Sequence, residues 1–310
     1  MMQKSNGISS KNKWPYLFIT PYFLSYAVLS LFPILFTLYI SLTDWDLYGN
    51  RNFIGLGNYT QLFFHDAFFW KSLLNVIIFM AVYLPALVLM GMLVASLIES
   101  KLIRRKTFFR LSVFSAYMTT PVAVGIIFSL LFDWQGGFFN NMLMELGLIQ
   151  EKINWLGSVS SSRWVVILMV FWKNLGYFVM FYTAGMASID TSIYEAAVID
   201  GASSKDVFTR ITIPLLKPIN LFLIITSIIS GLQLVEEPML LFSGWSSGSS
   251  MVGGPDGSTF TPIWYMFDAS FNGSAFKYGK GAAIAYGTFL FIALFSVVGM
   301  KWINRDGEDK

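Results

Sequence analysis

Long uninterrupted apolar runs constrain the fold of this chain more than any other feature of its sequence. Hydrophobic residues make up 55% of its 310 positions and charged residues 13%, and several runs reach the length of about 20 residues that a helix needs to cross a bilayer. None of these runs alternates apolar and polar residues as a barrel strand does, and a backbone in lipid must satisfy its polar groups internally. The sequence therefore predicts an all-α integral membrane protein.

Six of the runs are long enough to span a membrane. They are predicted at 16–41, 72–98, 108–132, 164–186, 218–235 and 281–302. We find no internal repeat, low-complexity tract or soluble domain, so residues 1–310 are predicted to form one transmembrane domain.

The distribution of Lys and Arg predicts the orientation. If the N-terminus is cytoplasmic, fourteen basic residues fall in cytoplasmic segments and six in external ones, and Lys173 lies within a span. Basic residues are enriched on the cytoplasmic side of membrane proteins, so both termini and the segment 187–217 are predicted to be cytoplasmic. The net charge of +3 is explained by these loops, and no basic face interleaved with aromatic residues indicates nucleic-acid binding.

A polar segment at 187–217 interrupts the apolar runs and is predicted to form a helical hairpin. Ser192 and Glu195 have the spacing of a capping box, which would start a short helix. Gly201 can take the left-handed conformation that ends it.

A second helix is expected after this turn. Ser203 or Ser204 can cap its start, and Pro214 is predicted to end it because proline lacks an N–H donor and clashes with the preceding turn. Such a polar hairpin is suited to binding a partner protein. The alternative is an amphipathic helix at the membrane surface, which would be richer in Lys and Arg.

This hairpin resembles the EAA loop of the permease subunits of binding-protein-dependent ABC importers. The family pattern of Glu-Ala-Ala, Asp-Gly-Ala, Pro and Lys-Pro is met by Glu195, Ala196, Ala197, Asp200, Gly201, Ala202, Pro214, Lys217 and Pro218. Residues 41–45, 53–59 and 253–255 add a resemblance to the carbohydrate-uptake branch, which includes the maltose, multiple-sugar and glycerol-phosphate permeases.

The resemblance implies the type I importer permease fold in the inner (cytoplasmic) membrane of a bacterium. It also implies a second permease subunit, a dimeric cytoplasmic ATPase, an extracytoplasmic solute-binding protein and a carbohydrate substrate. ATP and Mg²⁺ would be bound by the ATPase, with no cofactor on this chain. In this family the EAA loop docks into the ATPase, which implies a coupling role for Glu195, Ala196, Ala197, Asp200, Gly201, Ala202, Phe208 and Pro214.

Polar and aromatic residues in the middle of the fourth predicted span are candidates for the translocation path. An ionisable group such as Lys173 costs several kcal/mol in lipid unless it faces protein or water. The resemblance implies that Trp172 and Tyr177 offer ring faces to a sugar and that Asn174 hydrogen-bonds its hydroxyls. The alternative is that the rings pack between helices while Lys173 pairs with a carboxylate or a carbonyl.

The fifth predicted span carries a polar stripe. Thr226, Ser230, Gln233 and Glu237 recur at three- and four-residue steps and so share one helical face. The resemblance implies sugar contacts for Thr226, Ser230 and Gln233. The alternative for the hydroxyl residues is ordinary hydrogen bonding between helices.

Two other classes of function, a secondary transporter and an enzyme, have less support in the sequence. Glu236 and Glu237 could form the ion site of a secondary transporter, but no other carboxylates in the spans form a relay. Enzymatic readings have little support, since His65 is the only histidine, the chain has no cysteine, and the Gly279-Lys280 pair lacks the rest of a phosphate loop.

Overall fold

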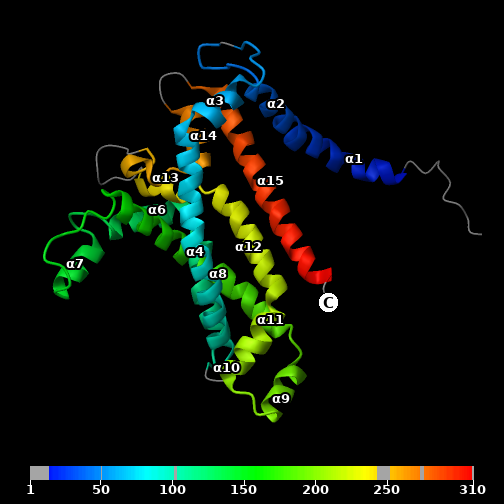
Figure 1. The fold of residues 1–310 in the computed structure, drawn as a ribbon, viewed down its shortest axis with the longest axis vertical. Coiled ribbons are helices and arrows are strands. Elements are labelled where there is room, and N and C mark those ends of the chain that lie inside the picture. Colours follow the sequence, from blue (N-terminus) through cyan, green and yellow to red (C-terminus); the bar gives the residue numbers. More distant parts are fainter. Residues whose placement is uncertain (1–13, 50, 101–102, 243–251, 273–275, 309–310) are drawn as a thin grey trace, which may run out of the picture.

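The computed structural model describes residues 14–49, 51–100, 103–242, 252–272 and 276–308. The regular elements of this part of the chain are helices joined by turns and loops, apart from one isolated bridge between Thr43 and Phe53 (Figure 1). The α-helices are α1 (Trp14–Tyr26), α2 (Phe32–Ser41), α3 (Gly57–His65), α4 (Ala67–Glu99), α5 (Lys106–Met118), α6 (Pro121–Leu131), α7 (Phe138–Glu145), α8 (Val159–Ala187), α9 (Thr191–Ile199), α10 (Ser204–Asp206), α11 (Ile213–Leu215), α12 (Lys217–Leu232), α13 (Glu236–Phe242), α14 (Pro262–Phe271) and α15 (Tyr278–Glu308). Two π-helical segments, η1 (Ala27–Leu31) and η2 (Val207–Thr212), and a 3-10 turn, η3 (Pro255–Gly257), complete them. The predicted all-α class is confirmed.

Four helical stretches are long and apolar enough to cross a membrane unbroken: Tyr16–Ser41, Ala67–Glu99, Val159–Ala187 and Tyr278–Val297. They overlap the first, second, fourth and sixth predicted spans.

The third predicted span is bent. α5 and α6 meet at 91°, because Thr119 and Thr120 are extended and Thr120 caps α6 ahead of Pro121. The fifth predicted span, 218–235, corresponds to α12, which ends earlier, at Leu232, and meets the helical stretch before it at 61° just ahead of this span. The described residues thus hold up to six spans if each bent pair counts as one.

The core lies where α4 and α8 pack against each other near the centre of the molecule (Figure 1). Asp66 caps α4 by accepting from the amides of Phe68 and Phe69 at 3.1 and 3.3 Å, and Ser158 caps α8. Phe79 and Tyr182 are fully buried between the elements. These two helices form the frame on which the other elements pack.

The first helical stretch stands apart from this frame (Figure 1). None of its apolar window is buried, and Phe18 and Leu29 are 79% and 75% exposed. α2 meets the bundle along α15, where the hydroxyl of Tyr286 donates to the carbonyl of Ile34 at 2.6 Å. Within the described residues, the remaining faces of α1 and α2 contact no other helix of the bundle along most of their length.

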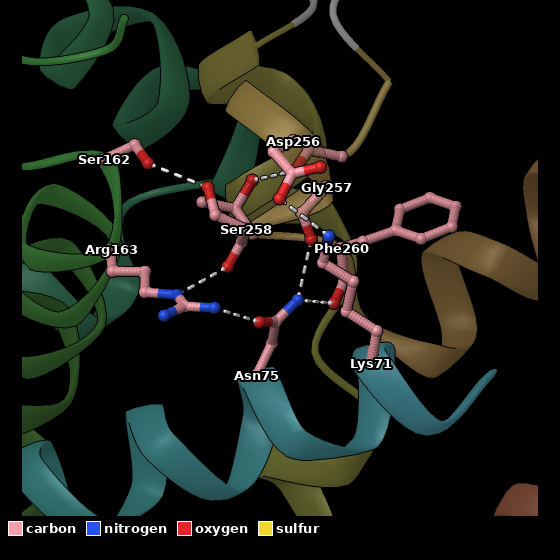
Figure 2. Close-up of polar contacts among 10 residues, drawn as sticks. Lys71, Asn75, Ser162, Arg163, Asp256, Gly257, Ser258 and Phe260 are labelled. Atoms are coloured by element: carbon pink, nitrogen blue, oxygen red, sulfur yellow. Dashed lines mark hydrogen bonds and ion pairs between the residues drawn. The ribbon is translucent and has the colours of Figure 1, made fainter. Parts of the chain in front are cut away.

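A buried polar knot joins the N-terminal parts of α4 and α8 to the loop at 253–261 (Figure 2). The Asn75 side chain is fully buried and donates to the carbonyls of Gly257 and Phe260 at 2.8 and 3.0 Å. Arg163 donates to the side-chain Oδ1 of Asn75 at 2.9 Å and to the backbone carbonyl of Ser258 at 3.2 Å. The two helices are therefore joined to each other by side chains, and both bind backbone atoms of the loop.

Two further contacts tighten this knot. The hydroxyls of Ser162 and Ser258 lie 3.0 Å apart, and Lys71 pairs with Asp256 at 3.0 Å (Figure 2). The Asp256 carboxylate is 78% exposed, so this ion pair is weak, and the buried amide and hydroxyl contacts hold the loop.

Candidate functional site

The first half of the polar hairpin is α9. Asp190 caps it by accepting from the Ser192 amide at 2.9 Å, so the predicted capping box of Ser192 and Glu195 is wrong. A carboxylate one residue before the helix competes better for the free amides than the Ser192 hydroxyl within it. The end of the helix is as predicted: Gly201 has φ of +78°, and the amide of Ala202 donates to the Ala197 carbonyl at 2.9 Å.

The second half of the hairpin runs from Ser204 to Leu215. Ser203 caps it, accepting from the Asp206 amide at 3.2 Å and donating to the Asp206 carboxylate at 2.5 Å. The hydrogen bond from Ser203 lowers the pKa of this carboxyl. The prediction that Pro214 ends the helix is wrong, since the helix continues to Leu215. The π turn η2 just before Pro214 alters the bonding pattern that a proline would otherwise break.

The hairpin lies at the end of the molecule opposite α3 and α14 (Figure 1). Glu195, Ala196, Asp200 and Pro214 are exposed, while Ala197, Ala202 and Phe208 are half-buried.

Sequence reasoning missed the most exposed apolar residues of the hairpin. Val198 and Ile199 are 68% and 85% exposed at the end of α9. The signal was available, since two adjacent β-branched residues directly precede the predicted turn. Phe208 was expected to seat the hairpin in a partner, but it packs against the protein core.

A cavity of about 360 Å³ lies where α4, α5, α8, α12 and α13 meet. Its lining residues are Tyr83, Leu87, Tyr117, Val170, Asn174, Tyr177, Thr226, Ser227, Ser230, Gly231, Gln233, Leu234, Val235, Glu236 and Glu237. The structure thus brings together five of the six predicted path residues. The exception is Trp172, which is 40% exposed and packs against Phe128 with ring centroids 5.8 Å apart.

Polar side chains of the lining are anchored to their own helices. Asn174 donates to the Val170 carbonyl, Thr226 to the Phe222 carbonyl and Ser230 to the Thr226 carbonyl, each at 2.8 Å. Each anchored group keeps acceptor capacity on its oxygen atom. The wall therefore presents fixed acceptors to a polar occupant.

Three tyrosines supply the aromatic part of the wall. The rings of Tyr177 and Tyr117 are stacked, with centroids 5.0 Å apart, and Tyr83 of α4 also lines the cavity, with 4% exposure. Sequence reasoning missed Tyr83 and Tyr117. Each is an isolated tyrosine in an apolar run, and only the packing of α4 and α5 against α8 brings it to the cavity.

Charged residues mark one side of the cavity. Lys173 forms an ion pair with Glu237, with side chains 12% and 13% exposed, as in the alternative in which Lys173 pairs with a carboxylate or a carbonyl. The helix break at 233–235 lets α13 begin beside α8, and both Glu236 and Glu237 lie in its first turn, where acidic side chains are favoured. Burying charged side chains among apolar helices is costly unless polar groups surround them, and the polar lining of the cavity provides such surroundings.

Comparisons with known proteins identify the family of this chain. Residues 54–305 match the model of the family described as "Binding-protein-dependent transport system inner membrane component". The lactose transport system permease protein of Rhizobium radiobacter is 35% identical, covering 92% of this chain and 91% of the relative. The arabinooligosaccharides transport system permease protein of Bacillus subtilis is 30% identical, covering 94% and 89%.

A solved structure shares the fold. A chain of a bacterial ABC transporter involved in the import of the acidic polysaccharide alginate matches with a TM-score of 0.80 and 20% identity, covering 95% of this chain and 96% of that one. The family match spans most of the chain, and the relatives match over nearly their full length. The chain therefore belongs to the inner membrane components of binding-protein-dependent transport systems.

Proposed function

We propose that this permease passes a mono- to oligosaccharide across the membrane through the cavity between α4, α5, α8, α12 and α13. The observation that carries the proposal is the lining, in which the ring faces of Tyr117 and Tyr177 lie beside fixed amide and hydroxyl groups. Sugars offer C–H faces that pack on aromatic rings and hydroxyls that bond to polar groups. Relatives named for lactose and arabinooligosaccharide transport support this class of substrate.

The same proposal assigns coupling to the segment 187–217. Its hairpin would seat in a dimeric cytoplasmic ATPase, which holds ATP and Mg²⁺. Val198 and Ile199 support this role because exposed apolar residues at the end of a short rigid hairpin can fill a pocket of a partner. Closure of the ATPase would then rock the helices between inward-facing and outward-facing states.

Two further partners complete the proposal. A second permease subunit would cover the exposed apolar faces of α1 and α2 and form the other half of the path. An extracytoplasmic solute-binding protein would deliver the sugar. The alginate transporter was solved in complex with a periplasmic protein bound to an alginate pentasaccharide, which supports such a partner here.

The alternative, an ion-coupled secondary transporter with its ion site at Glu236 and Glu237, has less support. One of its two carboxylates, Glu237, already pairs with Lys173, and the chain belongs to a family of binding-protein-dependent transporters. The alternative would require uptake to continue without ATP while ion gradients are held.

The path is tested by the Tyr177→Ala substitution. Loss of the ring face should lower sugar uptake by about tenfold, which corresponds to about 1.4 kcal/mol of binding or transition-state energy. The matched control is Phe289→Ala, which removes a ring that is 58% exposed on α15, away from the cavity. Equal uptake by the two variants, at equal amounts of assembled complex, would contradict the assignment of the cavity.

The hairpin is tested by the Gly201→Asp substitution. An aspartate at φ of +78° strains the turn and adds a charge, so ATP-driven uptake should be lost while the complex is still inserted in the membrane. Gly147→Asp is the control, because Gly147 also has a positive φ, +69°, and open space around it, but lies between α7 and α8. Normal uptake by the Gly201 variant would refute the coupling role.

A further inference from the structure

The cavity holds an unbalanced negative charge. Of the three charged side chains at its edge, Lys173 and Glu237 neutralise each other in a largely buried ion pair. Glu236 is exposed and lines the cavity, and among the described residues no Lys, Arg or His lies within salt-bridge range of it. The wall contributed by this chain therefore carries a net charge of minus one.

The helix break explains why two adjacent glutamates have different surroundings. α12 ends at Leu232, and α13 begins at Glu236 after a turn in which the Leu234 amide donates to the Gly231 carbonyl at 3.2 Å. Successive residues of a helix point about 100° apart, so one carboxylate reaches Lys173 while its neighbour faces the open cavity. The position of Glu236 is thus fixed by the same turn that forms the wall.

We infer that Glu236 is a specificity-determining residue that keeps anionic sugars out of the path. The inference rests on the proposed function and narrows its substrate class to uncharged saccharides, against uronates and sugar phosphates. The Glu236 carboxylate repels a second anion that enters the cavity beside it, and the protein wall screens this repulsion less than bulk water would.

A neutral sugar meets no such barrier. The Glu236 carboxylate is an acceptor for sugar hydroxyls, and it adds to the acceptor groups of Asn174, Thr226 and Ser230 in the same lining. The same side chain therefore favours a hydroxyl-rich neutral ligand and disfavours an anion.

The charge is measured first, without any sugar. The chain contains no cysteine, so a single Ser230→Cys substitution places one thiol in the cavity. Its rates of labelling by a cationic and an anionic methanethiosulfonate are compared in the assembled transporter. Ser160→Cys, at an exposed position in the first turn of α8, supplies the reference ratio for open water.

We expect the ratio of cationic to anionic labelling at Ser230→Cys to exceed the reference by about tenfold, equivalent to about 1.4 kcal/mol. Adding Glu236→Gln should bring it to within about threefold of the reference. The matched control, Glu151→Gln, removes an exposed carboxylate outside this cavity and should leave the ratio unchanged. A ratio that does not respond to Glu236→Gln overturns the inference.

Sugar selectivity is measured second, by saturation-transfer NMR on the purified transporter without its binding protein, whose own preference would otherwise enter. The probes are the methyl glycosides of glucose, galactose and arabinose and the uronate counterparts of the first two. Neutral glycosides should bind about tenfold more tightly than the uronates, and Glu236→Gln should reduce this preference to about threefold. Binding without charge preference overturns the inference and leaves the proposed function standing, whereas binding of no probe overturns both.

Discussion

Helices α5 and α8 approach each other closely at Gly176, and this contact provides a test of the packing. A Cβ atom added to Gly176 on α8 would lie 2.3 Å from the carbonyl oxygen of Val113 and 2.7 Å from the Cα atom of Phe114. Both are backbone atoms of α5, so no side-chain rotation can relieve the clash. In Gly176→Ala, α5 must move away by about 1 Å to restore ordinary contact distances.

The size of the effect follows from two opposing terms. Overpacking of a core costs about 1–3 kcal/mol, whereas replacing a helical glycine by alanine gains about 0.5–1 kcal/mol. We expect a net loss of about 1 kcal/mol in the free energy of unfolding. The shift of α5 also moves Tyr117 relative to Tyr177, whose ring centroids are now 5.0 Å apart, so sugar binding should weaken as well.

The assay is the melting temperature of the detergent-purified transporter. Gly299→Ala is the matched control, since Gly299 lies within α15 and its added Cβ would be 3.6 Å from Ile225, an ordinary contact. The control should melt at or slightly above the wild-type temperature, and Gly176→Ala should melt several degrees below it. If both variants melt alike, the close packing of α5 on α8 does not stabilise the protein and the reasoning is refuted.

Three further predictions concern polar contacts outside the cavity. Asn75→Leu removes the donor to two buried loop carbonyls and the acceptor for Arg163, so it should lower the free energy of unfolding by about 3 kcal/mol, measured by chemical unfolding. Wild-type stability of this variant would count against the structural role of the polar knot. Ser203→Ala removes a helix cap and should cost about 1 kcal/mol, measured by faster proteolysis of the hairpin. Burial raises the pKa of Asp66, but hydrogen bonds from Lys280 and Tyr265 outweigh this effect and lower the pKa below its ordinary value. The ionised carboxylate therefore stabilises the folded state above about pH 4, and this stabilisation is lost as the pH falls through the folded-state pKa. A melting-temperature series on Asp66→Asn should lack that acid-dependent component, and an unchanged acid profile would count against it.

The apolar runs predicted the helices well because run length and hydropathy are local properties. The breaks were harder. The break at 119–120 could have been found, because the residue before Pro121 is biased away from helix, yet Pro85 lies inside an unbroken α4. Whether a proline bends a span depends on how neighbouring helices satisfy the freed carbonyl, and that is a property of the packed bundle.

In the candidate site, too, local sequence properties were predictable and properties of the packed bundle were not. Thr226, Ser230 and Gln233 line the cavity, as the helical periodicity predicted. The prediction that Glu237 continues the same helical face is wrong, because α12 ends at Leu232 and Glu237 belongs to α13. Trp172, two residues before Asn174, lies outside it, because the rotation of α8 about its axis is set by packing that periodicity alone does not reveal. The coupling and sugar-binding roles of these residues stay predictions until the substitutions above are measured.

The knot of Figure 2 also bears on how this transporter can diversify. Asn75 and Arg163 hold the loop at 253–261 through its main-chain oxygens, while the side chains of Ser258, Thr259, Phe260 and Thr261 are buried beneath it. Asp256, by contrast, has a carboxylate that is 78% exposed. Sequence change that leaves the loop attached to α4 and α8 is therefore restricted to such exposed positions, and there the surface can be altered to fit a different partner.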